Sequence, residues 1–334
     1  MSLNNKLLQK LTSAFGVMGD EEEVMGVVKS ELDSMGVKHE ETKYGDVLCG
    51  KLDQPALLLA AHCDEVGFMV RSVNEDGTLG VINLGWVKPH MLNETSVVIK
   101  TVSGEKVMAQ GFATVPMLDS DVPTFADVIL DVGADSAEEI EKMGVRVGDI
   151  GTFQKEFRMT DNAVFASALD NRLGVYQLLE YIRANPSVLD KAAVAFHTHE
   201  EANFEGLRGV VDRVQPTYTV ILDVFPVHQE LSRTDTPYGL GQGPSVLYQA
   251  GRYVMHYPMR KRFEALDQSL FKKVVIDTGP IEMEPLGVQK MGQTMATALY
   301  TPVRGYHAGV YTARVADIER MKPLLDAAIP AMTE

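Results

Sequence analysis

Two adjacent carboxylates, Glu200 and Glu201, follow the apolar stretch Ala193–Phe196 and are the first candidates for chemistry. This stretch predicts a strand in a sheet that is covered on both faces, and such sheets bind ligands at strand ends. Because successive side chains of a strand point to opposite sides, the pair could divide two tasks at one centre, with one carboxylate binding and the other moving protons. Paired glutamates also occur at solvated strand ends, so the pair alone leaves both interpretations open.

A histidine and an aspartate end a second apolar stretch. Pro55–Ala61 is continuously apolar, which is typical of a buried central strand, and His62-Cys-Asp64 follows it directly. A histidine at such a strand end is more often only hydrogen-bonded than bound to a metal. Asp64 favours the metal-bound interpretation of His62, because carboxylates commonly orient the ring of a histidine ligand.

Two further aspartates stand at predicted element ends. Asp170 precedes residues at helical spacing, so it lies near a helix N-terminus, where it could cap the helix or reach a metal at the sheet edge. Asp223 ends the apolar stretch Tyr218–Leu222. Three strand ends tipped by histidine, aspartate or glutamate are more than chance alone explains.

The composition is typical of a globular protein with two domains. The 334 residues are 45% hydrophobic and 23% charged, enough for a large core. A net charge of -15 opposes nucleic-acid binding, which requires clustered Lys and Arg. Two cysteines and a start without a signal-peptide core or a long apolar run predict a cytoplasmic chain that does not enter a membrane.

The pattern of predicted helices and strands changes twice along the sequence. Asn4–Phe15 and Glu21–Met35 have apolar residues at helical spacing and predict helices that cover a sheet. From residue 67 to residue 163, short β-type segments alternate with Gly, Asp and Pro turns, and α/β texture then resumes. We therefore expect an α/β catalytic domain of residues 1–66 and 164–334 with a parallel-rich, mixed central sheet flanked by helices, and a small inserted β-rich domain of residues 67–163.

The sequence resembles the cytosolic dinuclear metallo-aminopeptidases of the tetrahedral-shell type, which include glutamyl aminopeptidases and proteins once labelled endoglucanases. The resemblance runs nearly end to end. Its strength comes from the order and separation of six motifs: His62-Cys-Asp64-Glu65-Val-Gly67, Ala168-Leu-Asp170-Asn-Arg172-Leu-Gly174, Glu200-Glu201, Gly206-Leu-Arg-Gly209, Asp223-Val224 and Arg304-Gly-Tyr-His307.

The resemblance implies a role for each matching residue. Asp170 would bridge two divalent ions, with His62 and Asp223 completing one site, and Glu201 and His307 the other. Glu200 would be the general base, and Asp64 would stand behind His62. Mixed nitrogen and oxygen ligands suit Zn or Co, with Mn as a further choice, and a shared carboxylate can hold two ions around one water.

The resemblance also implies fold and assembly. The catalytic domain would be like that of the zinc peptidases, and the inserted β-rich domain, PDZ-like or a barrel, would serve in dimerisation or as a lid. Dimers would assemble into a hollow dodecamer that admits short peptides, the implied substrates. Nothing in the sequence independently predicts the number of subunits.

Several positions depart from the family pattern. Ala202–Glu205 is longer than the usual segment, and Gln293-Thr-Met-Ala296 stands where a Gly-Thr-Asp-Ala turn is expected, which leaves the preferred N-terminal residue open. Arg208, Arg252 and Lys290 could each offer positive charge to an acidic substrate. A strand would place His197 and His199 on the same side as Glu201, and we interpret both as residues that line the substrate site rather than as ligands.

The prediction is a dinuclear metallo-aminopeptidase. Two alternatives stay open: hydrolysis of another amide, such as an N-acyl amino acid, at the same metal centre, and a catalytically silent assembly protein that keeps the fold. The intact set of ligands and Glu200 opposes the silent protein, because a cluster of carboxylates is costly to keep together.

Overall fold

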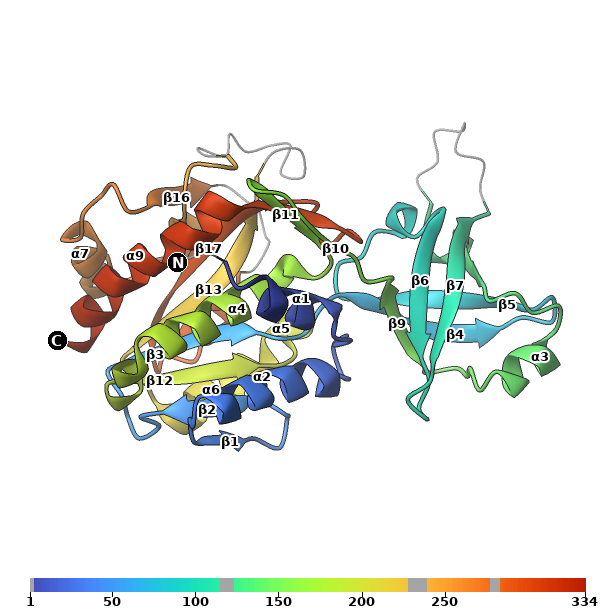
Figure 1. Ribbon diagram of the computed structural model, residues 1–334, viewed down its shortest axis with the longest axis horizontal. Helices are drawn as coiled ribbons and strands as arrows, with labels where there is room; N and C mark the ends of the chain where they lie inside the picture. Colours follow the sequence, from blue (N-terminus) through green and yellow to red (C-terminus); the bar gives the residue numbers. More distant parts are fainter. Residues whose placement is uncertain (1–2, 115–122, 228–238, 277–282) are drawn as a thin grey trace. The chain divides into compact units, whose positions relative to one another are not determined.

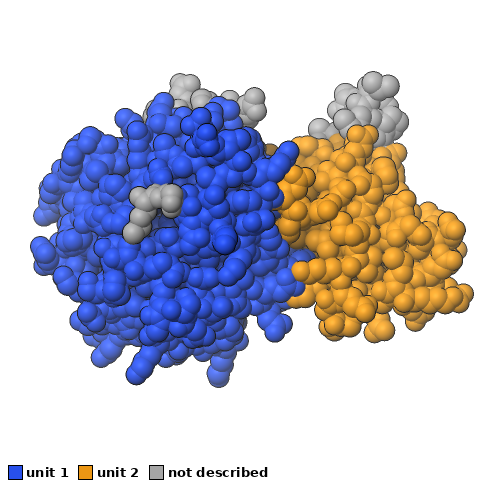
Figure 2. All heavy atoms as spheres, in the orientation of Figure 1, with its two compact units in different colours: residues 1–64, 157–306, 310–334 blue, residues 65–156, 307–309 orange. Residues whose placement is uncertain are grey.

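The chain folds into two compact units (Figures 1 and 2). The computed structural model describes residues 3–114, 123–227, 239–276 and 283–334. Unit 1 consists of Met1–Asp64, Phe157–Tyr306 and Val310–Glu334, and unit 2 of Glu65–Glu156 and His307–Gly309. Unit 2 is therefore almost entirely an insertion in the sequence of unit 1.

A mixed sheet of twelve strands, counted over the described residues, forms the centre of unit 1. Its continuous path is β1 (His39–Glu41), β2 (Val47–Gly50), β12 (Ala192–His197), β3 (Leu57–His62), β13 (Tyr218–Pro226), β17 (Met295–Arg304), β18 (Tyr311–Arg314), β11 (Ala163–Ala166) and β10 (Phe157–Met159), and β14 (Ser245–Ala250), β15 (Tyr253–Val254) and β16 (Lys272–Ile276) join beside β17. The run β12, β3, β13, β17 is parallel throughout. This is the parallel-rich α/β sheet that the sequence predicts.

Burial explains why the two central strands form where the apolar stretches stand. Every residue of β3 and β12 is buried. Strands covered on both faces read as continuous apolar runs, in contrast to the alternating pattern of a half-exposed strand. The carboxyl ends of these parallel strands meet at one edge of the sheet, and polar residues follow the apolar runs there.

Helices cover the sheet (Figure 1). In unit 1 the structure has α1 (Asn5–Ser13), α2 (Glu22–Ser34), α4 (Leu169–Ala184), α5 (Glu200–Asn203), α6 (Glu205–Val214), α7 (Tyr257–Glu264), α8 (Glu284–Gln289), α9 (Val315–Thr333) and the 3-10 turn Pro186–Asp190. Helix α4 contacts β3 and β13, and α1 and α9 pack on α4. Helix α6 contacts β12, and α8 contacts β17. The two predicted N-terminal helices are confirmed as α1 and α2. None of the helices in the described residues is both long and apolar enough to cross a membrane.

One buried arginine ties the N-terminal helix to α4. Arg172 is 0% exposed, and its guanidinium donates hydrogen bonds to the carbonyl oxygens of Leu11 (2.9 Å), Ala14 (3.3 Å) and Gly16 (3.4 Å). These carbonyls belong to the last turn of α1 and to the residues just after it, where no intrahelical donor is available. Arg172 therefore satisfies the end of α1 from the interior of unit 1.

Unit 2 is built around a closed barrel. Its strands follow the order β4 (Gly67–Val73), β5 (Thr78–Leu84), β8 (Val128–Asp131), β7 (Lys106–Ala113), β6 (Thr95–Lys100) and β9 (Ile150–Phe153). The unit also holds α3 (Ala137–Lys142) and the 3-10 turns Pro89–Met91 and Phe125–Asp127. A separate apolar cluster, which includes Phe68, Leu79 and Leu130, fills its interior. The predicted inserted β-rich domain is thus a barrel with its own core.

The predicted boundaries of this insertion need correction. The sequence places them at residues 67 and 163, whereas unit 2 begins at Glu65 and its main segment ends at Glu156. The second boundary is misplaced because β10 looks like one more short strand of the barrel. In the structure β10 pairs with β11, which pairs with β18, and all three belong to the sheet of unit 1.

Replacing Arg172 by methionine is expected to lower the free energy of unfolding by about 3 kcal/mol or more, because charged hydrogen bonds are lost and carbonyls stay buried without donors. Arg183, on the same helix, makes exposed ion pairs with Glu31 and Glu180 and is the matched control. Arg183→Met should cost less than about 1 kcal/mol. Urea unfolding measures both, and equal losses would contradict the role given to Arg172.

Candidate metal centre

The strand ends of unit 1 bring a histidine and several carboxylates together. His62 is the last residue of β3, and Asp223 lies in the neighbouring parallel strand β13. The Nε2 atom of His62 is 3.2 Å from Asp170 Oδ1, 3.8 Å from Asp223 Oδ1 and 3.8 Å from Glu200 Oε2. Five of the predicted site residues, those four and Glu201, form this group, called here the carboxylate cluster.

Potential ligand atoms in the cluster lie close enough to share an ion. One atom each from His62, Asp170 and Asp223 lies within 4.8 Å of the others, and the same holds for His62, Glu200 and Glu201. Imidazole nitrogen with carboxylate oxygen is a donor set that suits divalent transition metals. The residues present therefore fit a metal centre, although their individual ligand roles stay predictions.

Asp170 is placed by its neighbour Asn171, a residue to which the sequence assigns no task. Asp170 and Asn171 stand at the start of α4 with non-helical backbone angles. The Asn171 side chain donates to the carbonyl of Leu222 (2.7 Å) and accepts from the amide of Gly174 (2.9 Å). Leu222 directly precedes Asp223, so one amide side chain fixes both aspartates. Gly174 permits the contact, because a Cβ there would lie 2.6 Å from the Leu222 carbonyl oxygen.

The alternating pattern led us to expect that Glu200 and Glu201 continue a strand. They do not. Strand β12 ends at His197, His199 has a left-handed backbone (φ 56°), and α5 begins at Glu200. The amides of Glu200 and Glu201 donate to the two carboxylate oxygens of Asp64, at 3.1 and 3.0 Å. A carboxylate bound to free amides at a helix start is favourable. The two glutamates thus reach the cluster from a helical turn, and strand alternation does not separate them.

Asp64 also stands beside His62. Its Oδ1 atom is 3.5 Å from His62 Nδ1, and its own carbonyl oxygen is 3.2 Å from that nitrogen. Both residues are buried. Burial raises the pKa of Asp64, but hydrogen bonds and charge from His62 and the two amides outweigh it, so the pKa lies below its usual value. Asp64 therefore stays ionised and faces His62 with negative charge.

A second buried aspartate, Asp46, supports the turn between β12 and α5. It accepts from the Thr198 amide (3.0 Å) and hydroxyl (3.0 Å), and from the Thr42 hydroxyl (2.7 Å). The sequence gives no signal for this contact, because Asp46 and Thr198 are 152 residues apart. Its effect is to hold the backbone two residues before Glu200.

The carboxylates of the cluster repel one another in a buried place. Burial, followed by the charges of Asp223, Asp64 and Asp170, raises the pKa of Glu200 to about 8, although His62 opposes this rise. Burial and then Asp170 raise the pKa of Asp223 to about 7, and burial and Asp170 also raise the pKa of Glu201. Positive charge from divalent ions would relieve this repulsion.

The positive charge that the cluster itself provides is small. Burial lowers the pKa of His62, but the charge of Glu200 and the hydrogen bonds to Asp170 and Asp64 outweigh burial and raise that pKa well above its usual value. One imidazolium cannot balance the surrounding carboxylates. The donor set and the excess of negative charge both fit bound cations.

The last predicted ligand, His307, is grouped with unit 2, and its ligation stays a prediction. Tyr306, the residue before it, belongs to unit 1. Burial, then the charges of Asp170 and Glu201, raise the pKa of the Tyr306 hydroxyl. The ring of Tyr306 is therefore within electrostatic reach of the cluster.

His197 and His199 occupy different surroundings. His197 is 0% exposed, and its Nε2 atom is 3.3 Å from Oε1 of Glu284, at the start of α8. His199 lies outside the strand, with its Nδ1 atom 3.5 Å from Glu21 Oε1. The expectation that both lie on one side of a strand is therefore wrong. Sequence reasoning missed Glu284 because neither a motif nor a predicted strand end marks it.

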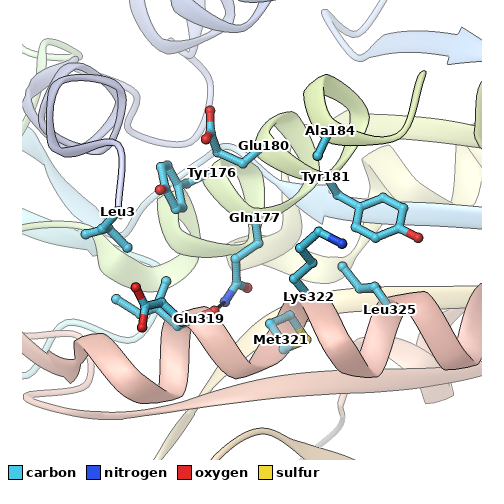
Figure 3. Close-up of a pocket in the computed structure, with 11 residues that line it drawn as sticks. Leu3, Tyr176, Gln177, Glu180, Tyr181, Ala184, Glu319, Met321, Lys322 and Leu325 are labelled. Atoms are coloured by element: carbon cyan, nitrogen blue, oxygen red, sulfur yellow. Dashed lines mark hydrogen bonds between the residues drawn. The ribbon is translucent and has the colours of Figure 1, made fainter. Parts of the chain in front are cut away.

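A separate cavity of about 110 Å³ lies elsewhere in unit 1 (Figure 3). Tyr176, Tyr181 and Glu180 of α4 line one side, and Met321, Lys322 and Leu325 of α9 line the other. No predicted site residue lines this cavity. It is therefore distinct from the carboxylate cluster.

Comparison with known proteins gives the chain a family. The sequence profile of the M42 glutamyl aminopeptidase family matches residues 46–324. The chain is 27% identical to the lysyl aminopeptidase of Pyrococcus furiosus over 96% of its own length and 95% of that protein.

Solved structures give the same fold. A TET aminopeptidase from a marine-sediment Thaumarchaeota archaeon has a TM-score of 0.87 at 23% identity, covering 98% of this chain and 99% of that one. A TET1 peptidase of Pyrococcus horikoshii, described as assembling into a tetrahedron or a large octahedral shell, has a TM-score of 0.84 at 24% identity and covers 96% and 98% of the two chains. These likenesses extend over both units.

The metal-free chain is expected to lose stability as the pH rises from 6.5 to 8.5. A carboxyl group whose pKa is higher in the folded chain binds more protons there, so its stabilising contribution is present at low pH and is lost as the pH passes the folded pKa. Asp223 (about 7) and Glu200 (about 8) titrate in this window, and His62, with a raised pKa, acts in the same direction. Burial and then His62 lower the pKa of His197 to about 4, so its destabilising contribution fades as the pH passes the ordinary histidine pKa of 6.5 and opposes the trend only at the start of the window.

Thermal unfolding with chelator, and again with Zn, Co or Mn, measures this effect. The free energy of unfolding should fall by about 2 kcal/mol or more across the window without metal. The gain on adding metal should be larger at pH 8.5 than at pH 6.5. A metal-free chain that is equally stable at both pH values would contradict the electrostatic description of the cluster.

Proposed function

The chain belongs to the M42 glutamyl aminopeptidase family and is thus a peptide hydrolase of the aminopeptidase class, and on this premise we propose that it removes N-terminal residues from short peptides at a centre of two divalent ions. The observation that carries this proposal is the carboxylate cluster, whose buried negative charge and mixed nitrogen and oxygen donors meet at the strand ends. The native metal would be Zn, Co or Mn.

Each residue of the cluster has a proposed task. Asp170 would bridge the two ions, His62 and Asp223 would hold one of them, and Glu201 and His307 would hold the other. When bound, the ions would polarise the scissile carbonyl and lower the pKa of the attacking water. Asp64 orients the ring of His62 and fixes the turn that carries both glutamates.

Chain connectivity supports the proposal that His307 is a ligand. Consecutive Cα atoms are about 3.8 Å apart, so His307 cannot lie farther than that from Tyr306. Tyr306 lies within the electrostatic influence of Asp170 and Glu201. A histidine attached there can complete the ion site that Glu201 begins.

Glu200 is the proposed general base. Its side chain is 15% exposed, whereas that of Asp170 is 3% exposed, so Glu200 is the more accessible of the two. Its pKa of about 8 lies near neutral pH, which suits a group that accepts a proton and then returns it. Glu200 would take a proton from the attacking water and deliver it to the leaving amine.

The proposed reaction requires a free amino terminus on the substrate. A centre with one ion for the carbonyl and a second for the amine accounts for removal of terminal residues rather than internal cleavage. N-acylated peptides lack that amine. They therefore distinguish this activity from hydrolysis of other amides at the same centre.

Self-association is also proposed. The exposed large apolar side chains of unit 2 include Ile82, Trp86, Met108 and Phe112, and exposed apolar groups of this kind are typical of protein interfaces. The TET1 relative assembles into shells. We infer that unit 2 supplies the first contact, between two copies of the chain.

Glu200→Gln is expected to lower kcat on aminoacyl amides by at least about 100-fold, because the amide cannot accept the water proton. Metal content, measured by mass spectrometry, and melting temperature should stay unchanged. Glu75→Gln, an exposed glutamate between β4 and β5, is the matched control and should keep full activity. Turnover of N-acylated substrates in place of free amines, or an active Glu200→Gln, would contradict the proposal.

The double substitution Ile82→Ser with Phe112→Ser is expected to shift the chain to a smaller assembly, because two exposed apolar contacts are removed. Light scattering coupled to gel filtration measures the mass. Val254→Ser, at an exposed position in unit 1, is the control and should leave the mass unchanged. An unaltered assembly in the double variant would place the contact elsewhere.

A further inference from the structure

Glu284 is a buried carboxylate that lacks hydrogen-bond donors in the described part of the chain. It is 3% exposed, and neither of its carboxylate oxygens accepts a hydrogen bond from a described residue. His197 Nε2 lies 3.3 Å from Oε1 but without hydrogen-bond geometry. An unsatisfied buried carboxylate is costly, so the arrangement becomes more favourable when a donor beyond the described residues, such as a substrate group, meets it.

His197 does not supply the missing positive charge. Burial, and then the charge of His62, lowers its pKa to about 4, so the ring is neutral at neutral pH. Burial and then the charge of Glu200 raise the pKa of Glu284 well above its usual value. The group that would stabilise Glu284 as a carboxylate is therefore a cation that the pair itself does not contain.

The pair of His197 and Glu284 faces the carboxylate cluster. His197 and His62 are register partners at the ends of the parallel strands β12 and β3, so their side chains lie on the same face of the sheet. Their ring centroids are 6.1 Å apart. Glu284 therefore borders the place where the N-terminal residue of a substrate would lie.

Helix α8 is held in position by the segment that departs from the family pattern. A Cβ on Gly287 would lie 2.7 Å from the Phe204 ring, so the glycine lets Phe204 of the Ala202–Glu205 segment pack closely on α8. Arg208 Nε donates to the Gly287 carbonyl oxygen at 3.3 Å. The longer segment thus fixes the helix that carries Glu284.

Of the three cations that the sequence offers to an acidic substrate, Arg208 donates to α8, and Arg252 and Lys290 are exposed. A glutamyl or aspartyl side chain beside Glu284 would bring a further carboxylate and no hydrogen-bond donor for the unsatisfied oxygens of Glu284 when that substrate side chain is ionised. The missing donor at this border therefore favours a basic substrate over an acidic one.

We propose that Glu284, supported by His197, is a specificity-determining residue that receives the cationic side chain of an N-terminal lysine or arginine. This rests on the proposed aminopeptidase function. The rings of His62, in the cluster, and His197, beside Glu284, lie 6.1 Å apart, so a group that reaches from the cluster to Glu284 has to be several bonds long. The flexible four-carbon stem of lysine spans such a distance, and its ammonium donates three hydrogen bonds.

Steady-state kinetics on lysyl, arginyl, leucyl and glutamyl amides tests the proposal. The wild-type chain should show kcat/KM at least about 10-fold higher for lysyl and arginyl than for leucyl amide, a difference expected of one charged hydrogen-bonded contact. Glu284→Gln should remove that preference and change leucyl turnover less than about 3-fold. Glu75→Gln, at an exposed position of unit 2, should behave as wild type. No preference for basic residues, or an equal loss on all substrates in Glu284→Gln, would overturn the proposal.

Calorimetric binding of lysinamide and leucinamide separates this inference from the proposed function. If the chain turned over no free-amine substrate, the proposed function would fail, yet tighter binding of lysinamide that Glu284→Gln abolishes would still support Glu284. Equal affinity for the two amides would overturn the inference even in an active enzyme. Should Glu284→Gln fail to fold, Glu284→Asp should shift the preference from lysine toward the longer arginine, and an unchanged ratio would contradict the role.

Discussion

Repulsion among buried carboxylates is the constraint on which the rest of this structure depends. Asp170, Glu200, Glu201 and Asp223 share a small space around one imidazole, and the fold must hold them there against their own charge. It does so with rigid parts: three parallel strand ends, the Asn171 bridge and the Asp64 carboxylate. Such preorganisation is what a catalytic centre requires, because the cost of assembling the charges is met when the chain folds.

The sequence predicts those parts of the site that local patterns encode. Apolar runs locate β3 and β13, and the turn to helical spacing locates the start of α4, so His62 and Asp170 are found at the predicted element ends, whereas β13 continues past Asp223 to Pro226. The turn after β12 is not encoded locally. Its shape depends on Asp64 and Asp46, more than 130 residues away, which explains why the strand prediction for Glu200 and Glu201 is wrong. Asn171 and Glu284 escape prediction for the same reason, since their contacts are visible only after folding.

The residues proposed for substrate preference and those proposed for the chemistry lie in different parts of the chain. The family motifs supply the cluster, whereas Glu284 and the Ala202–Glu205 segment lie where the chain departs from the family or has no motif. The family description names glutamyl substrates, whereas the role proposed for Glu284 favours basic ones. A family name is thus informative about the reaction and much less so about the residue that is removed, because few contacts determine the latter.

Asp64 has a consequence for how this site can change. One carboxylate contacts the ring of His62 and, through two backbone amides, carries the turn of Glu200 and Glu201. The ring of His62 and the turn that carries Glu200 are therefore tied to the same side chain. Under the proposed mechanism, a substitution that displaces Asp64 would disturb ion binding and proton transfer together. Elements outside this contact, such as α8, can then vary without disturbing it.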